Sequence, residues 1–180
     1  MDFIPEKNEN TKEVPYFDDV TSDAGWQGHS TTKSIETLKS EVSESLSRLG
    51  AIVLKTQMGT FSATNKARQG MRIDYMIEAP GKSVSGRIDI AALPVRISGG
   101  TMKTLEKRKS QSMKMALYML RMALDGMWFL EQLSPGYAAL LPWMLVDKNE
   151  TFGQKWTNTM NFASLLPKNE DFVDGIVVND

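Results

Sequence analysis

Hydrophobic residues recur at three- and four-residue steps along residues 34–49: Ile35, Leu38, Val42, Leu46 and Leu49. This spacing places them on one face of an amphipathic helix, with polar residues on the other faces. Four hydroxyl residues before it are candidate N-caps: Ser30, Thr31, Thr32 and Ser34. Gly50 follows at the position where a left-handed backbone ends many helices, so the sequence predicts a helix that stops there.

Three segments after this helix have the composition of β-strands. Residues 51–56 are mostly apolar, as in a buried strand, and residues 72–78 and 87–90 alternate between apolar and charged side chains. The turn residues 79–82 between the last two predict a β-hairpin, whose second strand could continue to Val95 or Ile97. Residues 58–70 have the pattern of a polar loop.

A long helix is predicted from about Thr104 to Leu133, ended by Ser134, Pro135 and Gly136. Residues 137–146 suggest a short helix followed by a strand. The expected fold is therefore α+β: a small antiparallel sheet, made of a strand plus a hairpin, packed against an amphipathic helix and one long helix. We expect a flexible acidic arm over residues 1–30, a single domain over 31–166 and an acidic tail over 167–180, with Trp26 docking on the core.

The composition narrows the classes of protein that fit. Of the 180 residues, 41% are hydrophobic and 24% are charged, which is typical of a globular protein. The chain has no cysteine, which excludes disulfides, thiol nucleophiles and thiolate metal sites. No secretory signal and no uncharged run of ~20 residues is present, so we expect a cytoplasmic protein without membrane contact.

Positive charge is concentrated in the middle of the chain. Residues 55–121 carry 13 basic and 4 acidic side chains, whereas both flanking regions carry more acidic than basic ones. This distribution favours a polyanion ligand such as nucleic acid. The candidate binding residues are Lys55, Lys66, Arg68, Arg72, Arg87, Arg96, Lys103, Lys107, Arg108 and Lys109. Phe61 and Tyr75 are candidates for stacking on bases, although the alternation around Tyr75 is more typical of a core residue.

Lys103, Lys107, Arg108 and Lys109 fall at the predicted start of the long helix, where the helix dipole favours anions. A bound phosphate would reverse that preference. Two alternatives stay open: the charges are simply solvated, or the acidic ends of the chain fold back on them.

Catalytic patterns do not withstand inspection. Asp74 and Asp89 could be metal ligands of an atypical nuclease, but the Glu-x-Lys pair expected on the later strand is missing. Cross-strand pairing with Arg72 and Arg87 explains both carboxylates better. The single histidine, His29, supports neither a zinc site nor a catalytic triad, so we assign no catalytic, metal or cofactor residue.

The long helix is apolar on more than one face because of a run of methionines and aromatic residues. Core packing is one explanation. The other is a homo-oligomer or partner-protein interface through Met119, Met122, Trp128 and Phe129.

Residues 86–96 (GRIDIAALPVR), with Ala116-Leu117-Tyr118 and Trp128-Phe129-Leu130, resemble small uncharacterised proteins encoded by bacteriophages and prophages. The resemblance covers about residues 50–150 and implies a phage-related context, in which DNA-metabolism factors and inhibitors of host defence are both common.

The sequence therefore favours a non-enzymatic protein that binds nucleic acid, with single-stranded DNA or RNA as the preferred ligand. The alternative is a protein-binding inhibitor or accessory factor, for example of a host defence or replication complex. An atypical metal-dependent nuclease is the second alternative.

Overall fold

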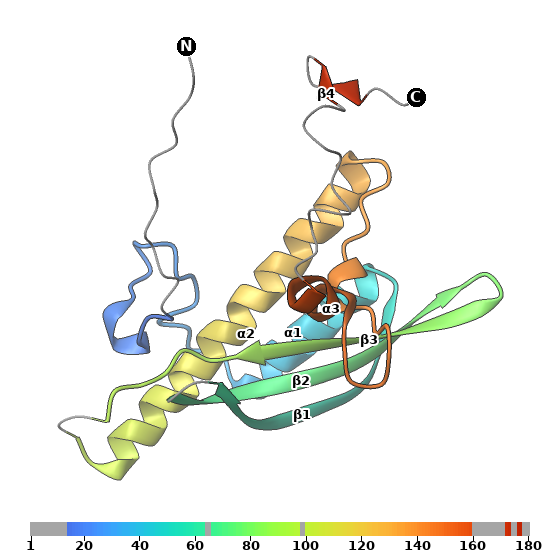
Figure 1. Ribbon diagram of the computed structural model, residues 1–180. Coiled ribbons are helices and arrows are strands. Elements are labelled where there is room, and N and C mark those ends of the chain that lie inside the picture. The colour runs from blue at the N-terminus through green and yellow to red at the C-terminus, as the bar shows by residue number, and fades with distance from the viewer. Residues whose placement is uncertain (1–13, 64–65, 98–99, 160–171, 174–175, 178–180) are drawn as a thin grey trace. The chain divides into compact units, whose positions relative to one another are not determined.

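The computed structural model describes residues 14–63, 66–97, 100–159, 172–173 and 176–177 (Figure 1). Its elements are η1 (Phe17–Asp19), α1 (Ile35–Arg48), β1 (Ala51–Ala63), β2 (Lys66–Ala79), β3 (Lys82–Ala91), α2 (Met102–Leu133), η2 (Leu141–Trp143), α3 (Phe152–Thr159), β4 (Phe172–Val173) and β5 (Ile176–Val177). One antiparallel sheet has the order β1-β2-β3, and β4 pairs with β5 in a second, two-stranded sheet. The predicted α+β class, with a strand plus a hairpin and one long helix, is confirmed.

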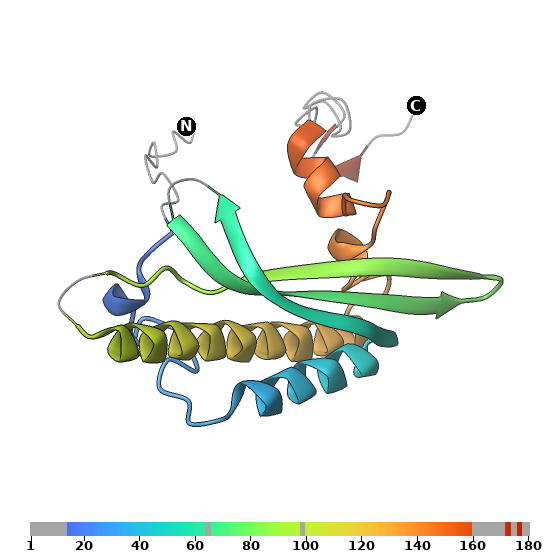
Figure 2. The same cartoon turned by 90° about the horizontal axis from the view of Figure 1, so that it is seen from below.

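The chain divides into two compact units. Unit 1 comprises Met1–Glu44, Gln57–Arg72 and Asp89–Ala123, and unit 2 comprises Ser45–Thr56, Ile73–Ile88 and Leu124–Asp180. Residues 31–166, expected to form a single domain, contribute to both. Each unit contains part of α1, of the three long strands and of α2, and within each the segments of α1 and α2 lie on one side of the strands (Figure 2).

The core of unit 1 is formed by the predicted apolar faces of the helices. Its fully buried side chains are Leu38 and Val42 of α1, Met71 of β2, and Met113, Met115 and Leu117 of α2. Ser34 caps α1, because its Oγ accepts a hydrogen bond from the Thr37 N–H at 3.0 Å. The predicted C-terminal glycine is also confirmed, since Gly50 has a φ of +80°.

The core of unit 2 contains Leu46, Ile73, Tyr75, Ile88 and Leu124, all of which are at most 1% exposed. Tyr75 fits because β3 carries a glycine beside it: a Cβ on Gly86 would lie 2.1 Å from the ring carbon Cζ. The Tyr75 hydroxyl donates a hydrogen bond to the Leu140 carbonyl at 3.4 Å. The alternation predicted for residues 72–78 is confirmed for Ile73 and Tyr75.

The strands are longer than the sequence predicts, and the expected burial of residues 51–56 is wrong for Ile52 and Leu54, which are 47% and 59% exposed. β1 and β2 continue through residues 58–63 and 66–70, which were expected to form a polar loop. Residues 57–60 are exposed in β1, so this part of the strand lacks the apolar alternation that marks a half-buried one. β3 ends at Ala91 rather than reaching Val95, and beyond it the Pro94 carbonyl accepts a hydrogen bond from the Phe17 N–H.

Residues 14–30, expected in a flexible arm, pack against the rest of unit 1. Phe17 and Val20 are buried with Leu93 and Met115, and Trp26 packs against this cluster as predicted. The remaining acidic-arm positions, 1–13, and most of the predicted tail lie outside the described residues.

The approach of Tyr75 to Gly86 gives a test of the unit 2 core. Replacement of Gly86 by Ala should lower the free energy of unfolding by about 1–3 kcal/mol, because the added methyl group overlaps the buried ring. Gly126→Ala is the matched control: its Cβ would meet no atom within 4 Å in α2, and it should add up to about 1 kcal/mol. Chemical denaturation measures both values, and an unchanged stability for Gly86→Ala would contradict this packing.

Candidate nucleic-acid interface

Eight of the ten predicted basic positions belong to unit 1, whereas Lys55 and Arg87 belong to unit 2. The surroundings of each charge decide whether it can reach a ligand.

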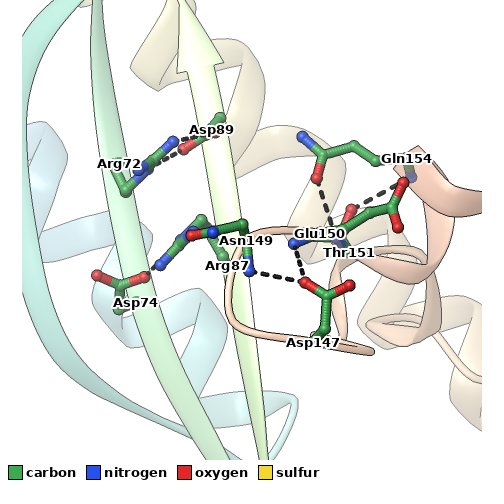
Figure 3. Close-up of polar contacts among 9 residues, drawn as sticks. All are labelled: Arg72, Asp74, Arg87, Asp89, Asp147, Asn149, Glu150, Thr151 and Gln154. Carbon is green, nitrogen blue, oxygen red and sulfur yellow. Dashed lines mark hydrogen bonds and ion pairs between the residues drawn. The ribbon is translucent and has the colours of Figure 1, made fainter.

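The hairpin arginines pair with carboxylates on the neighbouring strand (Figure 3). In unit 1, Arg72 donates two hydrogen bonds to Asp89, at 2.7 and 2.9 Å. In unit 2, Arg87 donates one to Asp74 at 2.9 Å. The cross-strand pairing predicted for these four residues is confirmed. Each pair offsets its own charge, so neither arginine adds an unbalanced positive charge to a binding surface.

Arg68 contacts backbone carbonyl groups instead of a carboxylate. Its guanidinium donates to the Ala92 carbonyl at 2.7 Å and to the Ala91 carbonyl at 3.1 Å. Burial lowers the pKa of Arg68. The side chain thus ties β2 to the end of β3, with its Nε and Nη2 groups held by the protein backbone.

The acidic residues of η1 bind the remaining two predicted arginines. Arg96 forms a two-bond ion pair with Asp19, at 2.7 and 2.6 Å, and Arg108 pairs with Asp18 at 2.7 Å. Asp18 also accepts the Arg96 backbone N–H at 3.0 Å. For these residues the second alternative left open by the sequence holds: part of the acidic segment folds back onto the basic one.

Asp18 is held in its charged form by these contacts. Burial alone would raise its pKa, but the hydrogen bond from the Arg96 backbone together with the hydrogen bond and charge of Arg108 outweigh it and lower the pKa below 3.8. The carboxylate therefore anchors η1 to the segment that leads into α2.

The same pattern extends to the two arginines outside the prediction. Arg48 pairs with Asp125 at 3.3 Å and lies 4.2 Å from the Trp128 ring centre, and Arg121 lies 3.9 Å from Glu41. All seven arginines of the chain therefore contact acceptors of the protein itself. The planar guanidinium suits such fixed, multi-bond contacts better than an ammonium group does.

The lysines at the start of α2 differ from the arginines. Lys103 and Lys107 are exposed, and within the described part of the chain neither has an ion pair. Lys109 pairs with Glu106 at 3.0 Å on the helix surface, a weak interaction. Lys55 is exposed in unit 2, and the side chain of Lys66 lies outside the described residues.

The two predicted stacking residues have different environments. Tyr75 is 1% exposed, and burial raises its pKa above its usual range, so the prediction that it stacks on a base is wrong. Its face of β2 is the core face, as the alternation indicated. Phe61 is half-buried and lines an open pocket, so it can reach a ligand.

The predicted interface residues of α2 also differ in their environments. Met119 packs against the Phe17 cluster, and the ring of Trp128 lies against Arg48, so both have internal partners. Met122 and Phe129 are 39% and 56% exposed. Sequence reasoning missed Leu130 and Leu133, which are exposed beside Phe129 in the last turns of α2.

The described residues contain no group of three or more potential metal-ligating side chains, and no helix among them is long and apolar enough to cross a membrane. His29 stacks on Phe17, with ring centres 4.5 Å apart. Comparisons with protein-family models, curated proteins and solved structures find no match to this chain.

The Asp18 contacts predict a pH-dependent contribution to stability. Because its pKa is lower in the folded protein, its contribution is present above about pH 4 and is lost as the pH falls through the folded value. Asp18→Asn should therefore cost about 1 kcal/mol at pH 7 and less at pH 3. Asp23→Asn, an exposed change in the same segment, is the control in urea unfolding at both pH values. An equal loss at pH 7 and pH 3 would argue against the ion pair.

Proposed function

We propose that the protein binds nucleic acid without catalysis, and that the first turns of α2 in unit 1 supply its main phosphate contacts. The observation that carries this proposal is the pair Lys103 and Lys107, both exposed and without an ion pair among the described residues. The first turn of α2 contains no acidic residue that could satisfy the helix dipole in their place.

Two physical effects support a phosphate ligand at this position. The amino end of a helix carries a partial positive charge, which disfavours cations by about 0.3–1 kcal/mol each. Lys103, in the first turn, lowers stability unless an anion is bound. The dipole and the ammonium groups of Lys103 and Lys107, which lie one turn apart, then attract the same ligand. Ile97 and Met102, 89% and 73% exposed, flank this turn and could contact sugars or bases.

We further propose that the ligand is single-stranded DNA or RNA. The protein would act in the cytoplasm, as part of a phage-related system. A single strand exposes its bases to apolar and aromatic side chains, which a duplex does not. The paired arginines are assigned a structural role, so the interface is narrower than the ten positions suggested by charge alone.

Replacement of Lys103 and Lys107 by Ala tests the proposal. The double variant should bind a single-stranded oligonucleotide more weakly, and the slope of log K against log salt should become shallower by about 1.4, since each lost phosphate contact on a single strand removes about 0.7. Fluorescence anisotropy at several salt concentrations measures both quantities.

The matched control removes two exposed lysines of unit 2, Lys82→Ala with Lys148→Ala, and should leave the slope close to that of the wild type. Equal effects of the two double variants would mean that only net charge matters. Wild-type protein that does not bind at low salt would exclude the proposed function.

Protein binding is the second candidate, supported by three exposed apolar side chains in the last turns of α2. Phe129, Leu130 and Leu133 are 56%, 46% and 78% exposed. Leu133 lies three positions after Leu130 and four after Phe129, and residues at these spacings are neighbours on a helix surface. Solvent contact of this apolar surface is unfavourable, so a protein partner would gain by covering it.

A second copy of the chain is the partner that can be tested directly. Sedimentation equilibrium should then give a concentration-dependent dimer for the wild type and a monomer for Phe129→Ser with Leu133→Ser. A wild type that stays monomeric at the highest concentration would remove self-association.

A further inference from the structure

Unit 1 carries an open pocket of about 310 Å³ on its strands. Five consecutive residues of β1, 57–61, and Arg72 of β2 line it. Arg72 alternates with the buried Met71, so the pocket lies on the strand face that points away from the core. None of these residues belongs to α2.

The pocket contains an aromatic side chain that is held in place. Phe61 packs against the backbone of Gly70, where a Cβ would lie 2.2 Å from the ring. Any larger residue at position 70 would displace the ring. Phe61 nevertheless stays half-exposed, so its ring is fixed from one side and accessible from the pocket.

The polar groups of the pocket suit a flat, uncharged ligand better than an isolated phosphate. Arg72 presents a planar guanidinium whose orientation is set by its two hydrogen bonds to Asp89, which also offsets its charge (Figure 3). Gln57, on the same strand face as Phe61, adds an amide that can both donate and accept. Aromatic, guanidinium and amide groups together match the edges and faces of a heterocyclic base.

We propose that this pocket binds one nucleobase, stacked on Phe61 and hydrogen-bonded by Gln57. The inference deepens the proposed function and rests on it, because the base would belong to the strand whose phosphates contact α2. The volume of about 310 Å³ lies at the lower end of the range for small-molecule sites, which suits one base with its sugar.

Two independent variants remove the pocket. Phe61→Ala deletes the stacking surface and should weaken binding of an oligonucleotide about tenfold. Gly59→Leu should weaken it similarly by filling the pocket: Gly59 lies between Gln57 and Phe61 on the strand, and an added Cβ there meets no atom within 4 Å. The open surroundings predict that Gly59→Leu folds, which its unfolding midpoint would verify. Phe61→Tyr and Gly59→Ala are the conservative controls and should bind nearly as the wild type does.

The ligands separate the pocket from the phosphate contacts. Anisotropy would compare a labelled oligothymidylate with an abasic strand of the same length, and equilibrium dialysis would measure free thymidine monophosphate. The pocket variants should weaken the oligothymidylate and leave the abasic strand unchanged, whereas the Lys103 and Lys107 variant should weaken both.

Each outcome distinguishes the two proposals. Pocket variants that bind the oligothymidylate as tightly as the wild type overturn the nucleobase pocket, while a loss in the lysine variant would still support the proposed function. Thymidine monophosphate binding that depends on Phe61, without binding of either strand, supports the pocket for free nucleotides and overturns the proposed function. Binding of neither strand nor monophosphate by the wild type overturns both.

Discussion

The contacts between guanidinium groups and the protein's own oxygen atoms determine which positive charges of this chain can bind a ligand. Arg72, Arg96 and Arg108 hold carboxylates at 2.6–2.9 Å, and Arg68 holds two backbone carbonyls. An exposed pair of this kind adds only about 0.2–1 kcal/mol to stability. The pair has a larger effect on phosphate binding, because a phosphate would have to displace the carboxylate that already contacts the arginine.

This division between arginines and lysines gives the basic segment two roles. Arginines fasten β2 to β3 and η1 to the approach to α2, which shapes unit 1. Lys103 and Lys107 remain solvated at the start of α2. The ammonium group is a compact, hydrated charge on a flexible stem, and it can meet a phosphate without breaking an internal contact. A net charge close to zero is therefore compatible with a local cationic surface.

Local patterns in the sequence predicted the elements whose side chains alternate between core and solvent. The apolar face of α1 and the buried Ile73 and Tyr75 follow from a period of 3.6 or 2. The predicted hairpin indicated that Arg72 and Arg87 pair across the strands with Asp74 and Asp89. Residues 58–70 could not be assigned in this way, because successive residues of β1 are exposed here on both faces and therefore carry no apolar alternation.

The contacts of the segment around η1 could not be predicted from local sequence patterns for a different reason. Asp18 and Arg108 are 90 residues apart, and nothing near either residue specifies the other as its partner. A count of charges located the basic segment but could not show which charges were already paired. The candidate basic residues are for this reason fewer than the ten predicted positions and lie at the start of α2. The pocket beside Phe61 could not be predicted either, because the residues next to Phe61 in the sequence do not indicate it.

Residue-specific chemical labelling, followed by mass spectrometry, tests the division between arginines and lysines most directly. An amine-acylating reagent and an arginine-selective dicarbonyl would be applied to the protein with and without a single-stranded oligonucleotide. The account predicts rapid acylation of Lys103 and Lys107, protection of both by the oligonucleotide, and slow modification of Arg68, Arg72, Arg96 and Arg108 in either state. Arginines that react readily and become protected by the oligonucleotide, with no change at the two lysines, would contradict it.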